Sequence, residues 1–204
     1  MERIPVVRRP LVVVISSPSG GGKTTLCERL LREERSLVRG VTCTTRAPRG
    51  GEAPGRDYHF LSESEFAQRQ ANGEFLEHAV VHGRHYGTLR QTVLDALARG
   101  QDILLAIDVQ GAAQIRAAAR QAPPDDPLAR GYVDVFVAPP SLDVLRDRLR
   151  RRAEDAPEEI ERRLRNAAGE LERWREYRYR VVNDDLPTAL AQIQAILAAE
   201  HCRV

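Results

Sequence analysis

Residues 11–25 read LVVVISSPSGGGKTT, an apolar run followed at once by a glycine-rich loop that holds a lysine. The continuous β-branched run predicts a strand buried on both faces, and the residues that follow, TTLCERLLREE, have the apolar spacing of a helix. In this order, a strand, a glycine loop and a helix place backbone N–H groups around an anion at the helix N-terminus. We expect those N–H groups to come from Gly20, Gly21, Gly22 and Lys23.

The loop departs from the usual phosphate-binding pattern at one position. The pattern places a glycine five residues before Gly22, and this sequence has Ser17 there. The first glycine serves the turn between strand and loop, so we expect a small residue to make the same turn. Lys23 is the single lysine among 31 basic residues. A compact ammonium on a flexible stem suits phosphates as a point charge.

Three further apolar segments predict strands, at 102–108, 131–140 and 177–184, and each is followed by a helical pattern. Ser141 is a candidate N-cap for the third helix, and Pro187 stands near the start of the last one. Strands that alternate with helices indicate an α/β fold with a mainly parallel central sheet and right-handed crossovers.

Three segments interrupt this alternation. Residues 41–88 predict short strands and one helix, for which Ser62 and Glu65 form a capping box, and we interpret them as an inserted subdomain. Residues 122–131, rich in proline and aspartate, are expected to be a surface loop. Residues 148–166 are dense in arginine and helical, with a turn near their middle.

Composition limits the class of protein. The chain has 204 residues, a net charge of +2 and three cysteines without a C-x-x-C pair. The near-zero charge does not indicate nucleic acid, the longest clean apolar run is too short for a membrane span, and the odd cysteine count argues against a disulfide framework. We therefore expect a cytoplasmic protein that binds neither nucleic acid nor a membrane. The oligomeric state stays open, and a homodimer is one alternative.

The inserted segment contains TCTTRAPRGGEAPGRDYHF at 42–60, then GEFLEHA at 73–79 and HYGT at 85–88. With these motifs in this order after the glycine loop, nearly the whole chain resembles guanylate kinase, the enzyme that phosphorylates GMP with ATP. The resemblance implies a P-loop three-layer fold with an inserted GMP-binding subdomain and a helical lid. It also implies boundaries: core at 1–40, 91–147 and 167–204, GMP-binding subdomain at 41–90, and lid at 148–166.

The resemblance assigns a phosphate-binding and a base-binding set to GMP, and the chemistry suits both. Arg46 and Arg49 can clamp one phosphate bidentately, with hydroxyl donors from Tyr58 and Tyr86. The Glu77 carboxylate accepts from the guanine N1–H and exocyclic amine together, a donor pair that adenine lacks. The other implied base contacts are Thr42, Thr88 and Asp108. Taken singly, an arginine pair in a loop is often solvated, and a lone Glu77 would be an ordinary exposed acid.

The resemblance also assigns the ATP side. The implied contacts are Ser17, Pro18, Ser19, Gly20, Gly21, Gly22, Lys23, Thr24, Thr25 and Asn183. The hydroxyl of Thr24 would hold Mg²⁺. For Asn183, near the adenine, a cap or turn role is an open alternative. The family usually has an acid at the position of Ala106, so no metal role is carried over to it.

Phosphoryl transfer needs in-line positioning and cations around the equatorial oxygens. The residues implied as catalytic are Lys23, Arg46, Arg148, Arg152 and Arg163. Most other arginines of 148–166 fit a solvated helix with Glu–Arg pairs, and the run at 150–152 leaves the identity of one lid arginine open by one position. The expected substrates are ATP and GMP or dGMP.

Three alternatives share parts of this pattern. A ribose bisphosphate phosphokinase has the same scaffold but does not need Glu77 with the arginine and tyrosine set. A non-catalytic guanylate-kinase-like module that binds a phosphopeptide can do without the glycine loop and Lys23. A regulator that only binds nucleotide would not need the acceptor motif.

Overall fold

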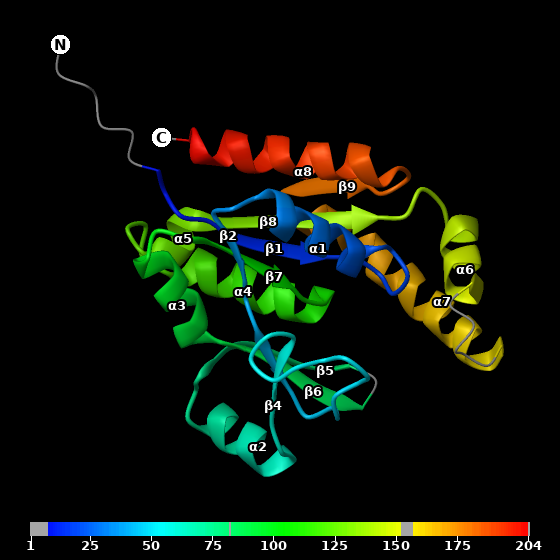
Figure 1. The fold of residues 1–204 in the computed structure, drawn as a ribbon, viewed down its shortest axis with the longest axis horizontal. Coiled ribbons are helices and arrows are strands. Elements are labelled where there is room, and N and C mark those ends of the chain that lie inside the picture. Colours follow the sequence, from blue (N-terminus) through cyan, green and yellow to red (C-terminus); the bar gives the residue numbers. More distant parts are fainter. Residues whose placement is uncertain (1–7, 82, 152–156, 204) are drawn as a thin grey trace.

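The computed structural model describes residues 8–81, 83–151 and 157–203. Five parallel strands form the central sheet in the order β2-β7-β1-β8-β9. Their bounds are Val12–Ser16 (β1), Leu37–Arg39 (β2), Asp102–Ala106 (β7), Tyr132–Ala138 (β8) and Tyr179–Val182 (β9). The sheet lies between two layers of helices, as predicted (Figure 1).

Alternation along β1 explains the three layers. Val12 and Val14 join the apolar cluster that includes α3 (Arg90–Ala98) and α4 (Val109–Gln121). Leu11, Val13 and Ile15 join the cluster on the other face, with α1 (Lys23–Glu33) and α8 (Leu186–His201). All five of these side chains are fully buried. A strand covered on both faces must be apolar at every position, and this accounts for the unbroken run in the sequence.

The segment after β2 builds a second sheet, in the order β4-β3-β6-β5, with α2 beside it (Figure 1). The elements are Thr42–Thr44 (β3), Tyr58–Phe60 (β4), Glu63–Ala71 (α2), Phe75–Val81 (β5) and Arg84–Leu89 (β6). The predicted capping box of Ser62 and Glu65 is present. Cys43, Phe66 and Phe75 form a small apolar core of their own, so this sheet is separate from the central one.

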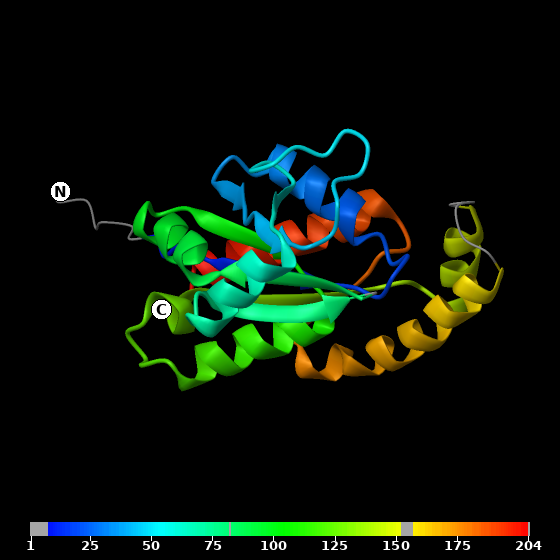
Figure 2. The same cartoon turned by 90° about the horizontal axis from the view of Figure 1, so that it is seen from below.

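Helices α6 (Leu142–Arg151) and α7 (Pro157–Glu172) project from one end of the molecule (Figure 2). The Ser141 hydroxyl accepts from the N–H of Val144, as expected of an N-cap. The helices pack through their own cluster, made of Leu145, Leu149, Leu164 and Ala167. This arm therefore has an apolar contact of its own, apart from the two faces of the sheet. The turn expected near its middle lies outside the described residues.

The structure corrects several expected boundaries. Residues Pro127–Gly131, expected as loop, form a short helix α5, because the Asp126 carboxylate accepts from the Leu128 N–H and a proline stands in the first turn. The strand expected at 177–184 is limited to β9, since a 3₁₀ turn at Arg173–Glu176 precedes it. The edge strand β2 was not predicted. No helix of the described segments combines the length and apolar character that a membrane span requires.

Candidate active site

The glycine loop joins the end of β1 to the start of α1, and Ser17 shapes its first turn. The Ser17 hydroxyl donates to the carbonyl oxygen of Pro18 at 3.2 Å. A Cβ on Gly21 would lie 1.9 Å from that hydroxyl oxygen, so the Ser17 side chain leaves no room for a side chain at position 21. The Gly21 N–H donates to the Pro18 carbonyl at 2.9 Å. It is therefore not open to an anion, contrary to the prediction from the sequence.

Two other glycines of the loop have backbone and contact reasons for their identity. Gly20 and Gly22 adopt φ of 84° and 93°, the left-handed region that favours glycine. A Cβ on Gly20 would lie 3.0 Å from both Leu145 and Leu149 of α6. A Cβ on Gly22 would lie 2.2 Å from the side-chain nitrogen of Asn183. Helix α6 of the projecting arm and Asn183, which follows β9, therefore both pack closely against the loop.

The Lys23 ammonium lies at the carboxyl end of β7, where its Nζ donates to the Ile107 carbonyl at 2.8 Å. Burial lowers the pKa of this lysine, while the nearby Cys27 and Asp108 raise it. Thr24 and Thr25 follow in the first turn of α1 and are exposed. Thr24 and Lys23 both line a cavity of about 140 Å³.

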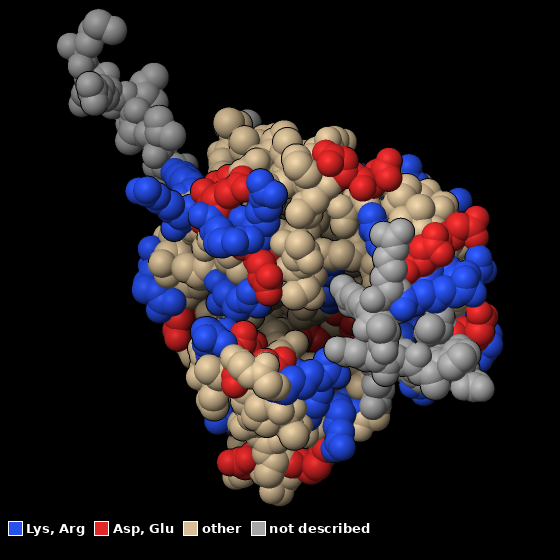
Figure 3. All heavy atoms as spheres, turned by 45° about the vertical axis from the view of Figure 1, so that its right-hand side comes forward, with Lys and Arg blue, Asp and Glu red and all other residues tan. Residues whose placement is uncertain are grey.

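The arginine-rich segment 42–60, the β5–β6 hairpin and the end of β7 enclose a cavity of about 190 Å³. Its lining residues are Lys23, Thr42, Tyr58, Glu77, Ala79, Val81, Tyr86, Ala106, Ile107 and Asp108. Figure 3 shows a hollow in the centre of one face of the molecule, with basic residues around it and acidic atoms inside it. Side chains from both sheets thus meet at the carboxyl end of a core strand, where ligands of open α/β sheets bind.

Glu77 is 3% exposed, and its Oε1 accepts from the Thr88 hydroxyl at 2.6 Å. A bulge between Phe75 and Glu77 shifts the β5–β6 register and brings Glu77 opposite Thr88. Burial, partly offset by the Thr88 bond, raises the pKa of Glu77 to about 7, and the Asp108 carboxylate adds to the increase. The site therefore holds a buried carboxyl group whose side-chain hydrogen bond comes from Thr88.

Asp108 lies two residues beyond the end of β7 and caps α4, because its Oδ1 accepts from the N–H groups of Gln110 and Gly111. The same side chain lines the cavity. Its position is therefore fixed by the helix start, and the expected strand end at 108 is corrected to Ala106. Ala106 is exposed and lines the cavities at both Glu77 and Thr24.

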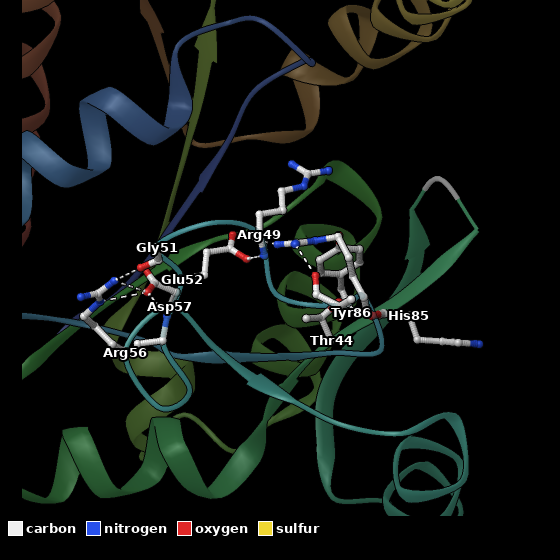
Figure 4. A network of polar contacts seen from close by, with 11 residues as sticks. Thr44, Arg49, Gly51, Glu52, Arg56, Asp57, His85 and Tyr86 are labelled. Atoms are coloured by element: carbon white, nitrogen blue, oxygen red, sulfur yellow. Dashed lines mark hydrogen bonds and ion pairs between the residues drawn. The ribbon is translucent and has the colours of Figure 1, made fainter. Parts of the chain in front are cut away.

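Arg46 follows β3 and is the centre of a polar network, whose members Arg49, Glu52 and Tyr86 are labelled in Figure 4. Arg46 donates from Nε to the Tyr86 hydroxyl at 3.3 Å and from its terminal nitrogen to Glu52 at 2.9 Å. Its guanidinium also lies 5.4 Å from the centre of the Tyr58 ring. The Glu52 carboxylate accepts in addition from the backbone N–H of Arg49 at 2.8 Å. The exposed Arg49 guanidinium extends away from this network (Figure 4).

A third cavity, of about 300 Å³, lies beside the glycine loop and shares no lining residue with the cavity at Glu77. Gly20, Gly22, Thr25, Arg148, Asn183, Asp184 and Leu186 line it. Asn183 is 5% exposed and donates from its side chain to the Gly21 carbonyl at 2.9 Å. Its own carbonyl accepts from Arg148 at 2.9 Å. Asn183 therefore supports the loop through its side chain, a role that sequence reasoning missed.

The arginines of the arm lie in different settings. Arg148, on α6, is half-buried and reaches the Asn183 carbonyl. Arg163 lies on α7 and is also half-buried. Arg152 lies outside the described residues. Of these three arginines, the structure shows Arg148 in contact with Asn183, which also contacts the glycine loop.

Glu170 of α7 was not predicted as a site residue. Burial and the Asp108 charge raise the pKa of its carboxyl group, and this increase is partly offset by Lys23 and by the backbone N–H of Ser19 in the glycine loop. No sequence pattern singles out this glutamate, because the contact depends on how α7 crosses the loop. Gly111 was missed for the same reason, since a Cβ there would lie 2.3 Å from Glu77 Oε2.

Comparison with known proteins identifies the family of the chain. The family model for guanylate kinase matches residues 8–200. The chain is 46% identical to guanylate kinase of Maricaulis maris over 96% of this chain and 86% of that protein, and 47% identical to that of Chelativorans sp. over the same shares. The crystal structure of guanylate kinase from Anaplasma phagocytophilum has a TM-score of 0.77 and 34% identity, over 97% of this chain and 89% of that one. The chain therefore belongs to the guanylate kinase family, the ATP:GMP phosphotransferases.

Proposed function

We propose that the cavity between the two sheets binds GMP, with the base at Glu77 and the phosphate at Arg46. The observation that carries this assignment is the buried Glu77 carboxylate, which faces a cavity and is held by Thr88. Guanine offers two adjacent donors to such a carboxylate, whereas adenine would leave it unpaired at a cost of about 1–3 kcal/mol or more. Asp108 and Thr42 line the same space and would contact the base edge.

The phosphate of GMP would lie near the Arg46 network. Arg46 already holds the geometry of a fork, with one arm on Glu52 and another on the Tyr86 hydroxyl. A phosphate dianion would take the place of the Glu52 carboxylate, and Arg49, Tyr58 and Tyr86 would complete its shell. Glu52 thus acts as an internal anion that keeps Arg46 oriented.

ATP would bind along the glycine loop, at Ser17 to Thr25. The cavity beside Gly20 and Asn183 would take the adenine, since it is lined by residues of the glycine loop and shares no lining residue with the cavity at Glu77. Lys23 and the arginines at 148, 152 and 163 would surround the transferred phosphoryl group. The regions 41–90 and 148–166 would act as acceptor subdomain and lid, whose closure excludes water.

Mg²⁺ would be held by the Thr24 hydroxyl together with phosphate oxygens and water. The donor set fits, because Mg²⁺ keeps several waters and uses few protein oxygens. The described residues hold no group of three or more His, Cys, Asp or Glu side chains suited to a metal ion. When bound, the ion would neutralise charge on the β- and γ-phosphates.

In the proposed step, a GMP phosphate oxygen attacks the γ-phosphorus of ATP in line. A new P–O bond forms, the bond to the bridging β–γ oxygen breaks, and the electron pair stays on ADP. No side chain needs to act as a covalent nucleophile. Lys23 and the arginines only bind and orient the oxygens.

We also propose that the protein is cytoplasmic and binds neither nucleic acid nor a membrane.

The proposal includes dGMP as a second acceptor. A coupled assay with ATP and each of GMP, dGMP, AMP, UMP and ribose 1,5-bisphosphate tests which acceptors the enzyme uses. We expect turnover of GMP and dGMP at least 10³-fold above AMP, because the site rejects a base without the donor pair. Faster turnover of AMP or of the sugar bisphosphate would contradict the assignment of Glu77.

A further inference from the structure

The first turns of α4 lie directly against β5 of the inserted sheet, and Gly111 marks the closest approach. Gly111 is buried, and a Cβ on it would lie 2.3 Å from Glu77 Oε2 and 2.9 Å from the carboxyl carbon. No side chain fits there unless Glu77 moves. Glycine is unfavourable inside a helix relative to alanine, so a packing reason is needed for it at this position.

One turn further along α4, Gln114 contacts the same strand. Its Oε1 accepts from the His78 N–H at 3.1 Å, and its Nε2 donates to the His78 carbonyl at 2.7 Å. β5 is the outer strand of its sheet, so one edge of its backbone has no neighbouring strand. The Gln114 amide therefore pairs with the backbone N–H and C=O of His78, as a neighbouring strand would, at the residue next to Glu77.

The two contacts fix Glu77 from the side opposite its sheet partner. Thr88 of β6 holds Oε1, and the bare backbone at Gly111 sets how far Oε2 can reach. Asp108 caps the same helix and faces the same cavity. The carboxyl groups of Glu77 and Asp108 are thus both placed by the start of α4, although Glu77 belongs to β5 of the inserted sheet and Asp108 follows β7 of the central sheet.

We propose that Gly111 and Gln114 are positioning residues for guanine recognition: through them, the core helix α4 sets the orientation of the Glu77 carboxylate. The inference rests on the proposed function of Glu77 as the group that reads guanine. Under this inference, selectivity for guanine depends on the packing of α4 against β5, and not on the inserted sheet alone.

The first test is Gly111→Ala, with Gly169→Ala as the matched control. Gly169 lies in helix α7, and a Cβ there would meet nothing within 4 Å. We expect Gly111→Ala to raise the KM for GMP by about tenfold or more, since the added methyl displaces a carboxylate oxygen. The KM for ATP should stay unchanged within error. The Tm should stay unchanged or rise, because alanine is more favourable than glycine inside a helix. The control should leave both KM values unchanged.

The second test is Gln114→Leu, with Gln121→Leu as its control on the same helix. Gln121 is exposed at the far end of α4. Losing two partly solvated hydrogen bonds should raise the KM for GMP about fivefold, and Gln121→Leu should not change it. Gln114→Glu keeps the acceptor to the His78 N–H and loses the donor to the His78 carbonyl. Its KM for GMP should therefore lie between the values of the wild type and of Gln114→Leu.

A double-mutant cycle separates the inference from the proposed function. In a Glu77→Ala background, Gly111→Ala should have no further effect on the KM for GMP, because the clashing atoms are gone. Additive effects, or an equal rise of the KM for ATP, would overturn the positioning role while leaving Glu77 as the base-reading group. An unchanged KM for GMP in Glu77→Ala alone would overturn both.

Discussion

The Lys23 ammonium donates to the carbonyl oxygen of Ile107 at 2.8 Å, so the chain's single lysine is held at the carboxyl end of β7. This bond places the cation between the glycine loop and the cavity that contains Glu77 and Asp108. Under the proposed function, this is where the donor and the acceptor phosphates would meet. Its partner is a neutral carbonyl, which a phosphate can replace without leaving a buried ion pair broken.

Lys23→Met should therefore lower kcat by about 10³-fold while GMP binding stays nearly intact, since one charge-stabilising donor is typically worth that much. A coupled assay gives kcat, and calorimetry gives the GMP affinity. Lys23→Arg should not restore the rate, because a planar fork cannot take the same single-carbonyl position as a compact ammonium. Full activity of Lys23→Arg would show that only the charge matters.

Glu77→Gln should make the protein more stable at alkaline pH. The folded-state pKa of Glu77 is about 7 and the unfolded value is 4.5, so the native state holds a proton that the unfolded state has lost between these values. Stability of the wild type should thus fall as the pH rises from 4.5 to 7, by about 3 kcal/mol in all. Glutamine does not titrate, and the variant should escape this loss.

Urea unfolding of both proteins at pH 5, 6, 7 and 8 measures the difference. The stability gap should widen in favour of Glu77→Gln as the pH rises through this range and level off near pH 8. The same variant should lose GMP turnover, because an amide presents its own donors to guanine. Parallel pH profiles for the two proteins would mean that Glu77 is not buried as described.

Arg46→Lys should raise the KM for GMP by about tenfold to a hundredfold. A lysine cannot reach the Tyr86 hydroxyl and a second anion through a rigid fork, as the guanidinium does. Arg56→Lys is the matched control from the same segment, since the exposed Arg56 binds Asp57 and the Gly51 carbonyl outside the cavity (Figure 4). An equal effect of both changes would point to the loop's fold and not to the phosphate.

Asn183→Ala should raise the KM for ATP and leave that for GMP unchanged. The change removes the donor to the Gly21 carbonyl and leaves a buried acceptor unpaired, which costs about 1–3 kcal/mol of stability. Steady-state kinetics with each substrate varied and thermal unfolding check both parts. Asn72→Ala serves as the control, since Asn72 is exposed and far along the inserted segment. A rise confined to GMP would contradict the placement of the ATP site.

Much of the fold could be predicted because it depends on local patterns. The apolar run of β1, the capping box at Ser62 and the cap at Ser141 each have their physical cause within a few residues. The edge strand β2 could not be predicted, because three residues carry too little periodicity. The α5 helix was missed because its caps lie in a segment whose prolines and aspartates also favour a loop.

The glycine loop with its lysine, the buried parallel strands and the residue types of the proposed GMP site could all be recognised in the sequence. These features depend on identity and spacing, and spacing along the chain is all that a sequence displays. Three features of the site became visible only in the folded chain. A bulge brings Glu77 opposite Thr88, the Asn183 side chain donates to the Gly21 carbonyl, and α4 approaches the Glu77 carboxylate closely at Gly111. The reason is physical: each of these contacts joins segments distant in sequence, and its distance is set by the packing of whole elements.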